Sequence, residues 1–167
     1  KTLYRQARGI DDRPVLPPDT KSFVLEEITL EEDTNDDGLL SGMLYALMEN
    51  ACHRMRKKNV LSETVWLHLR YSDGMDVTRR MKLINPVLAD PLLFKKLEPF
   101  FIKSNFRRQR IRYIGLTFTD LFHPPDQLSF FDSFTAPTRE DKLVDALDII
   151  RKKYGQSAVA FGRTLNS

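Results

Sequence analysis

Three arginines, Arg108, Arg110 and Arg112, recur at every second position of a β-like run that continues to Phe118. Because successive side chains of a strand point to opposite faces, this spacing puts all three guanidinium groups on one face. Like charges along one face repel each other unless an extended partner with repeating negative charge, such as a phosphate backbone, binds them. The alternative is an edge strand protected from aggregation by charge, for which lysines or mixed charges would serve equally well. We therefore interpret the run as a binding strand.

The charge of the chain is unevenly distributed. Its net charge is only +3, but residues 51–112 contain 15 Lys+Arg against 5 Asp+Glu, a surplus of 10 positive charges. Residues 26–37 contain seven acidic residues and no basic one. Such a polarised molecule favours polyanions, because binding releases their counterions. Part of the charge also has a structural explanation, since a helix prefers acid at its start and base at its end.

Other residues that could do chemistry lack the necessary spacing. The single cysteine, Cys52, excludes an internal disulfide and lies in an apolar helical pattern typical of a buried thiol. The paired carboxylates at 11–12 and 36–37 fall in an extended segment and at a helix start, where aspartate is common for structural reasons. The three histidines have no metal-ligand spacing with Cys52: His53, His68 and His123. The sequence therefore predicts no catalytic residue and no metal site.

The elements that position the arginines follow from hydrophobic periodicity. In chain order we expect a strand at 22–30, a helix ending near 58, a hairpin at 64–83, a helix at 90–103, the arginine strand, and a further helix at 139–154. This order, β-α-β-β-α-β, predicts an α+β fold with a four-stranded, mostly antiparallel sheet, two helices on one face and a C-terminal helical appendage. The opposite face is left to bind a partner. Along the arginine strand the apolar residues change from odd-numbered to even-numbered positions, which indicates a bulge near Gly115.

Two other classes of α/β module remain as alternatives. An RNA-binding module would carry aromatic side chains on its central strands for base stacking, whereas here Trp66 is the main aromatic on the open faces. A ferredoxin-like regulatory domain that binds a small ligand would need a concave apolar pocket rather than a large positive surplus.

Four short motifs, in order, resemble one family. They are Gly9-Ile10-Asp11-Asp12-Arg13-Pro14-Val15, Lys21-Ser22-Phe23, the basic hairpin, and Arg110-Ile111-Arg112-Tyr113-Ile114-Gly115-Leu116. Together they are similar to the C-terminal little-finger domain of bacterial Y-family translesion DNA polymerases of the DNA polymerase IV type. The resemblance implies a sheet that lies in the major groove of template–primer DNA and grips backbone phosphates without reading sequence.

The resemblance also implies particular DNA contacts. Carried over position by position, they are Lys21, Ser22, Arg79, Arg80, Lys82, Arg110 and Arg112. Arg108 is added by its spacing alone. The chain departs from the commonest family pattern at Tyr113 and Thr117, where relatives often carry further basic residues.

A second motif resembles the pentapeptide with which bacterial polymerases dock on the sliding clamp. It consists of Gln127, Leu128, Ser129, Phe130 and Phe131, with Phe130 where leucine is usual. Leucine and phenylalanine would fill a hydrophobic pocket of the clamp, and prolines on either side would keep the segment extended. The alternative is that these phenylalanines fasten the loop to the core.

The resemblance divides the chain into four parts: a tether at 1–20, a little-finger-like DNA-binding domain at 21–121, a Pro-rich loop at 122–138, and a helix with a short strand at 139–167. In this family the Mg²⁺-binding carboxylates belong to a palm domain that would precede Lys1, so we expect a non-catalytic fragment without a cofactor of its own. The expected partners are primer–template DNA, the bacterial sliding clamp and the remainder of the polymerase. Without a signal peptide or membrane-length apolar run, a cytoplasmic location is expected.

Overall fold

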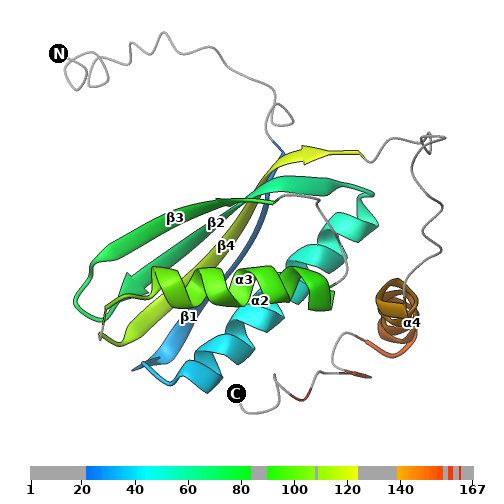
Figure 1. The fold of residues 1–167 in the computed structure, drawn as a ribbon. Coiled ribbons are helices and arrows are strands. Elements are labelled where there is room, and N and C mark those ends of the chain that lie inside the picture. The colour runs from blue at the N-terminus through cyan, green and yellow to red at the C-terminus, as the bar shows by residue number, and fades with distance from the viewer. Residues whose placement is uncertain are drawn as a thin grey trace, which may run out of the picture.

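The computed structural model describes residues 22–83, 90–107, 109–123, 139–155, 158–159 and 162. Its elements are β1 (Val24–Thr34), α2 (Asp37–Lys57), β2 (Leu61–Tyr71), β3 (Asp76–Lys82), α3 (Asp90–Ser104), β4 (Ile111–Phe122) and α4 (Arg139–Tyr154). The strands form one sheet in the order β1-β4-β2-β3, and every neighbouring pair is antiparallel (Figure 1). The predicted β-α-β-β-α-β order and fold class are confirmed. The proposed tether and Pro-rich loop lie mainly outside the described residues.

Helices α2 and α3 cover the same face of the sheet and enclose the core (Figure 1). Helix α2 begins after Asp36, whose carboxylate accepts a hydrogen bond of 2.8 Å from the Leu39 amide and so satisfies one free N–H of the first turn. The sheet contributes alternate side chains to this core, among them Ile114, Leu116 and Phe118 of the central strand β4, all fully buried. No helix in the described part of the chain is long and apolar enough to cross a membrane.

The hairpin of β2 and β3 has the predicted faces. Alternate residues of β2, from Val65 to Tyr71, are buried against the helices. The pairing runs in unbroken register from Thr64 opposite Lys82 to Arg70 opposite Asp76. Trp66, His68 and Arg70 therefore lie on the uncovered face, as expected from the alternation.

The bulge in β4 lies elsewhere than predicted. Both neighbouring strands shift register between Ile111 and Tyr113, whereas Gly115 pairs regularly on both sides. The reason is visible in burial, since Ile111 and Ile114 are both fully buried although three residues apart, which requires one extra residue between them. Gly115 instead leaves room for a neighbour: a Cβ there would lie 2.6 Å from Tyr113 Oη.

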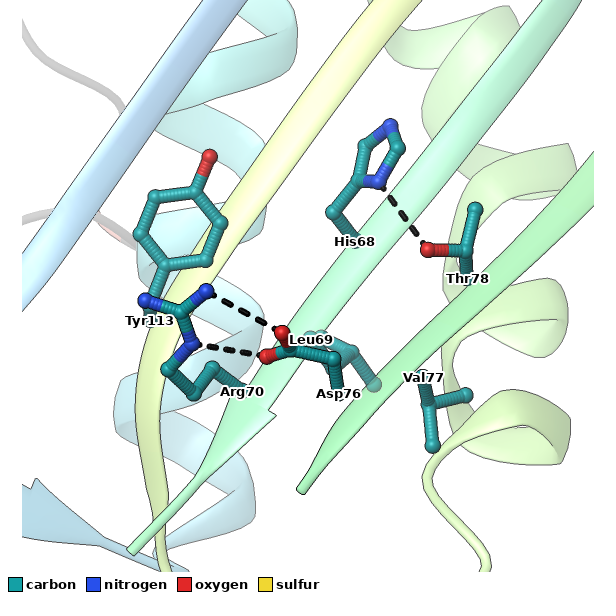
Figure 2. Close-up of a pocket in the computed structure, with 7 residues that line it drawn as sticks. All are labelled: His68, Leu69, Arg70, Asp76, Val77, Thr78 and Tyr113. Atoms are coloured by element: carbon teal, nitrogen blue, oxygen red, sulfur yellow. Dashed lines mark hydrogen bonds and ion pairs between the residues drawn. The ribbon is translucent and has the colours of Figure 1, made fainter. Parts of the chain in front are cut away.

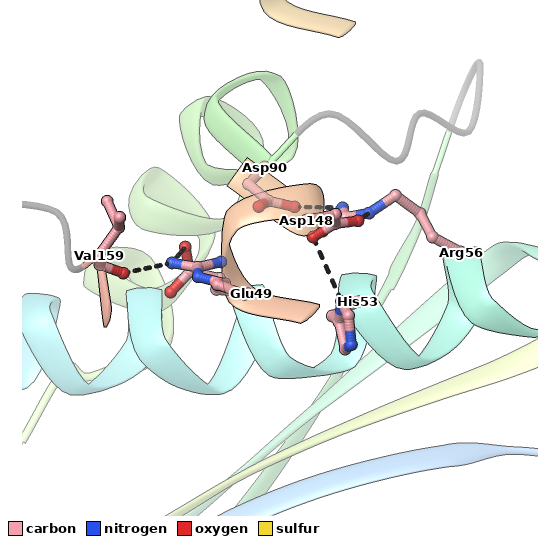
Figure 3. Close-up of polar contacts among 7 residues, drawn as sticks. Glu49, His53, Arg56, Asp90, Asp148 and Val159 are labelled. Carbon is pink, nitrogen blue, oxygen red and sulfur yellow. Dashed lines mark hydrogen bonds and ion pairs between the residues drawn. The ribbon is translucent and has the colours of Figure 1, made fainter. Parts of the chain in front are cut away.

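Helix α4 packs against the C-terminal half of α2 through charged side chains (Figure 3). Arg56 of α2 donates to Asp148 of α4 at 2.8 Å and to Asp90 at the start of α3 at 2.7 Å, so one guanidinium joins three helices. Arg151 of α4 donates to Glu49 of α2 at 2.7 Å. Figure 3 shows Asp148 reaching towards both Arg56 and His53. We call this set of contacts the helix junction.

Only some of the apolar side chains of α4 are buried in that packing. Those at helical spacing are Leu143, Ala146, Leu147, Ile150 and Tyr154, and of these only Leu147 is buried. The buried stripe consists of Val144, Leu147 and the 4% exposed Arg151. Apolar and charged side chains therefore share the buried side of α4.

Candidate nucleic-acid interface

The sheet face that α2 and α3 leave uncovered is the candidate interface, here called the open face. Antiparallel register brings the outward residues of the four strands into rows. They are Leu25, Glu27 and Thr29 of β1; Tyr113, Gly115, Thr117 and Thr119 of β4; Thr64, Trp66, His68 and Arg70 of β2; and Asp76, Thr78, Arg80 and Lys82 of β3. The surface is polar and mixed in charge.

The predicted arginines at the start of β4 flank one hollow. Arg110 immediately precedes the strand and Arg112 lies in the bulge, and both side chains are exposed. With residues 29–33 of β1 they line a hollow of about 520 Å³. Arg112 makes a two-pronged contact with Asp33, Nε to Oδ1 at 3.0 Å and Nη2 to Oδ2 at 2.8 Å. This hydrogen-bonded pair lowers the pKa of Asp33 and raises that of Arg112.

The three hairpin cations do not share one face. Arg80 and Lys82 lie on the open face, where the Arg80 guanidinium is 5.7 Å from the centre of the Trp66 ring. Arg79 pairs with Leu67, so it lies on the helix side of the sheet, 5.9 Å from the Phe106 ring. Adjacent residues of a strand cannot both point to one face, and grouping Arg79 with its neighbours ignored this alternation.

A second hollow, of about 300 Å³, lies at the end of the hairpin (Figure 2). Arg70 forms an ion pair with Asp76, at 2.7 Å and 3.1 Å, and its guanidinium is 5.9 Å from the centre of the Tyr113 ring. His68 Nδ1 is 3.2 Å from Thr78 Oγ1. Arg70 is a candidate that the motif comparison missed, although the alternation of β2 had already put it on this face.

Tyr113 is one of the two positions at which the chain departs from the family pattern described above. Its hydroxyl donates a 2.7 Å hydrogen bond to Glu27 Oε2, across the space that Gly115 leaves open. Burial, this hydrogen bond and the Glu27 charge raise the pKa of Tyr113 to about 12. A neutral phenol bonded to a carboxylate therefore lies on the open face between Thr29 and Arg70, its partners in the neighbouring strands.

The open-face cations divide into two groups. Asp33 and Asp76 neutralise Arg112 and Arg70. Within the described ranges, Arg80, Lys82 and Arg110 form no ion pair, and these three can accept anionic groups directly. Their positions span the strands β3 and β4, with β2 between them. This arrangement can hold several phosphates along an extended backbone.

The remaining site predictions are only partly covered by the structure. Ser22 is exposed just before β1. Lys21, Arg108 and the motif at 127–131 lie outside the described residues. Cys52 is fully buried, as predicted, and burial raises the pKa of its thiol. In the part of the chain that the structure describes, no group of three His, Cys, Asp or Glu side chains could hold a metal ion.

Two solved structures that share this fold come from DNA polymerases. The Dbh DNA polymerase in an insertion ternary complex has a TM-score of 0.54 and 16% identity, over 74% of this chain and 35% of that one. The little finger domain of PolIV in complex with the beta-clamp processivity factor has a TM-score of 0.50 and 18% identity, over 67% of this chain and all of that one. The fold is that of a Y-family little finger.

Sequence relatives assign the family. The model of the impB/mucB/samB family C-terminal domain matches residues 21–130, so the chain belongs to this family. DNA polymerase IV of Desulfatibacillum aliphaticivorans is 32% identical over 162 residues, covering 95% of this chain and 41% of that protein. DNA polymerase IV of Dehalococcoides mccartyi (strain CBDB1) is 33% identical over 165 residues, covering 97% and 41%. The chain therefore spans about two fifths of the length of these relatives.

Proposed function

We propose that this chain is the DNA-gripping and clamp-docking part of a Y-family DNA polymerase. In this function the open face holds template–primer DNA by its phosphates while nucleotidyl transfer takes place in another part of the enzyme. The observation that carries the proposal is that three exposed cations have no carboxylate partner among the described residues: Arg80 and Lys82 on the open face, and Arg110 just before β4. A grip of this kind fixes position without reading bases, because phosphates are the same at every sequence.

The state of the aromatic rings supports backbone binding over the RNA-binding alternative. Base stacking needs an accessible ring face. The Arg80 guanidinium lies over the Trp66 ring, and Trp66 Nε1 also donates to Thr119 Oγ1 at 3.3 Å. Arg70 lies over the Tyr113 ring in the same way. The ferredoxin-like alternative is weakened by the hollows themselves, which are lined mainly by charged and polar side chains.

Clamp docking and catalysis rest on sequence and family. The Gln-Leu-Ser-Phe-Phe segment at 127–131 and the likeness to a little finger solved with its clamp support the docking proposal. The relatives are named DNA polymerase IV, which supports membership of a complete polymerase. In that enzyme the Mg²⁺ needed for nucleotidyl transfer would be held by carboxylates outside this chain.

DNA binding by the chain, followed by fluorescence anisotropy over a range of salt concentrations, tests the first part of the proposal. Each phosphate contact contributes about −0.9 to the slope of log K against log salt. If Arg80, Lys82 and Arg110 each contact one phosphate, the slope should be about −2.7 or steeper. Duplexes of unrelated sequence should bind equally well. Affinity that does not respond to salt would contradict the proposal.

Calorimetry against the bacterial clamp tests the second part. Replacing Leu128 and Phe131 together with alanine should abolish clamp binding and leave DNA affinity unchanged, because two apolar anchors carry most of such an interface. Phe134→Ala is the matched control, since it removes a phenylalanine from the same segment but outside the motif. Undiminished clamp binding by the double variant would assign these side chains to the core instead.

A further inference from the structure

The acidic end of β1 lies against the arginines at the start of β4. Regular pairing stops at Thr29 opposite Tyr113 and resumes at Thr34 opposite Ile111. Residues 30–33 of β1 therefore face the single residue Arg112. This excess length carries Asp33 to Arg112, while Leu30 stays 7% exposed in the core and holds the segment in place.

The Asp33–Arg112 contact uses the donors that a phosphate would use. Both carboxylate oxygens accept from the guanidinium, at 3.0 Å and 2.8 Å. A phosphate presents a similar pair of oxygens to the same fork of N–H groups. One edge of Arg112 cannot serve both partners with full geometry, so the carboxylate and a DNA phosphate compete for it.

The position of the pair makes exchange possible. The Arg112 side chain is 49% exposed and that of Asp33 is 20% exposed. Water can therefore reach both partners, and separating the pair leaves neither charge fully buried. Arg110 lines the same hollow without an ion pair among the described residues, so it can attract a phosphate to the place where Arg112 is held.

We propose that Asp33 is an internal competitor of DNA: its carboxylate occupies Arg112 in the free protein and must give way when a backbone phosphate binds there. The inference rests on the proposed DNA-gripping function and adds a residue that sets its strength. A grip weakened in this way releases more readily, which suits an enzyme that must move along its template. Asp33 also keeps Arg112 in a defined orientation before DNA arrives.

Neutralising Asp33 without changing its shape tests the proposal. Asp33→Asn should raise the affinity of the full chain for template–primer DNA by about two- to fivefold, the range in which exposed ion pairs contribute. The salt slope should also steepen by up to about 0.9. In the wild type, DNA that takes Arg112 from Asp33 leaves a free carboxylate, which binds a cation from solution, and the asparagine variant has no such carboxylate. Glu32→Gln is the matched control, because it removes the same charge from the same hollow at a side chain with no hydrogen bond or ion pair to an arginine among the described residues.

A double-mutant cycle separates direct competition from general charge. In an Arg112→Gln background the gain from Asp33→Asn should disappear, since the two side chains would no longer be coupled. Thermal melts monitor folding, and Asp33→Ser provides a second neutral replacement. Equal gains for Asp33→Asn and Glu32→Gln, a gain that survives Arg112→Gln, or weaker binding by both Asp33 variants would each overturn the inference. A wild-type chain whose DNA binding ignores salt would instead contradict the DNA-gripping function itself.

Discussion

The open face and the helix junction contain the same kind of contact in different surroundings. On the open face, the pairs Arg112–Asp33 and Arg70–Asp76 are held at 2.8 Å and 2.7 Å, and both arginines are about half exposed. At the helix junction, Arg56 is 14% exposed and contacts Asp90 at 2.7 Å, where Asp90 is 1% exposed. Distances do not distinguish the two regions, but access of water does.

This difference decides which arginines are available to a ligand. A buried pair cannot exchange its partner, because the remaining charge would be left without water. An exposed pair can exchange its carboxylate for a phosphate at little cost. At least five of the 15 basic residues between 51 and 112 form ion pairs within the chain: Arg54, Arg56, Arg70, Arg107 and Arg112. A surplus counted along the sequence therefore overstates the charge offered to DNA.

The largest expected effect is at the helix junction. Arg56→Met should lower the free energy of unfolding by about 3 kcal/mol, because it leaves Asp90 buried without its partner. Urea unfolding measures this, and DNA affinity per folded molecule should not change. Arg54→Met is the control: this arginine, 51% exposed, pairs with Glu26, and its loss should cost less than about 1 kcal/mol. Equal losses would remove the distinction between the two regions.

Replacing a cation that has no ion pair among the described residues should weaken DNA binding and leave stability unchanged. Arg110→Ala should weaken DNA binding about tenfold, the contribution of one charge-assisted hydrogen bond, and reduce the salt slope by about 0.9. Its free energy of unfolding should stay within about 0.5 kcal/mol of the wild type, since the side chain is exposed. Lys95→Ala removes an equal charge from α3, in the helix layer. If it weakened DNA binding as much, net charge rather than the open face would be responsible.

Low pH should destabilise the helix junction, with a smaller effect than the two substitutions above. Burial raises the pKa of Asp148, but hydrogen bonds and charge from Arg56, with His53, outweigh burial and leave that pKa below its ordinary 3.8. A carboxyl with a lowered folded-state pKa stabilises the fold above its unfolded pKa, and this stability is lost as pH falls through the folded value. Melting temperatures should therefore fall below about pH 4, and Asp148→Asn should flatten this decline.

Salt distinguishes this acid response from that of the open face. The pKa of Asp33 is also lowered, chiefly by its hydrogen bond to Arg112, but that pair is exposed and screened by ions. In 1 M salt the acid dependence from Asp148 should persist and that from Asp33 should largely vanish. If in 1 M salt Asp33→Asn reduced the acid dependence of the melting temperature more than Asp148→Asn did, this prediction would be contradicted.

The smallest expected effect concerns Gly115. Gly115→Ala puts a Cβ 2.6 Å from Tyr113 Oη, so the ring must turn away from Glu27. Loss of that hydrogen bond, about 1 kcal/mol, is largely offset by the reduced entropy of the unfolded chain. Stability should thus change by less than about 0.5 kcal/mol, while the pKa of Tyr113 should fall from about 12 towards 10 in a spectrophotometric titration. Tyr113→Phe identifies the titrating group, and an unchanged pKa would mean that the contact survives.

Local spacing was sufficient to predict the elements and most of their faces. Alternation placed Trp66, His68 and Arg70 on the open face, because a strand has a strict period of two. The same alternation separates Arg79 from Arg80, which the motif resemblance alone does not do, and the DNA contact of Arg79 stays a prediction. The shift of apolar positions in β4 indicates the bulge correctly, but the glycine suggests the wrong place for it, because a glycine inside a strand often marks a bulge. Burial of Ile111 and Ile114 in the structure locates the extra residue between them.

Contacts between distant segments could not be predicted in this way. Arg112 and Asp33 are separated by 79 residues, and nothing local indicates that the longer β1 segment folds over the bulge. Arg56 looks like an ordinary basic residue at a helix end until α3 and α4 are packed around it. Nor does local spacing indicate that Arg151 of α4 is buried beside Val144 and Leu147, since its partner Glu49 lies 102 residues away along the chain.

The strand order has a consequence for how the chain is made. β4, the last strand along the sequence, lies between β1 and β2 and pairs with both. Until it leaves the ribosome, β1 and β2 each have an unpaired inner edge, and the sheet cannot close. We expect a chain truncated after Arg107 to remain unfolded by circular dichroism. During synthesis the earlier strands therefore stay unpaired until the segment that carries Arg112 emerges, and the open face forms only when the whole sheet does.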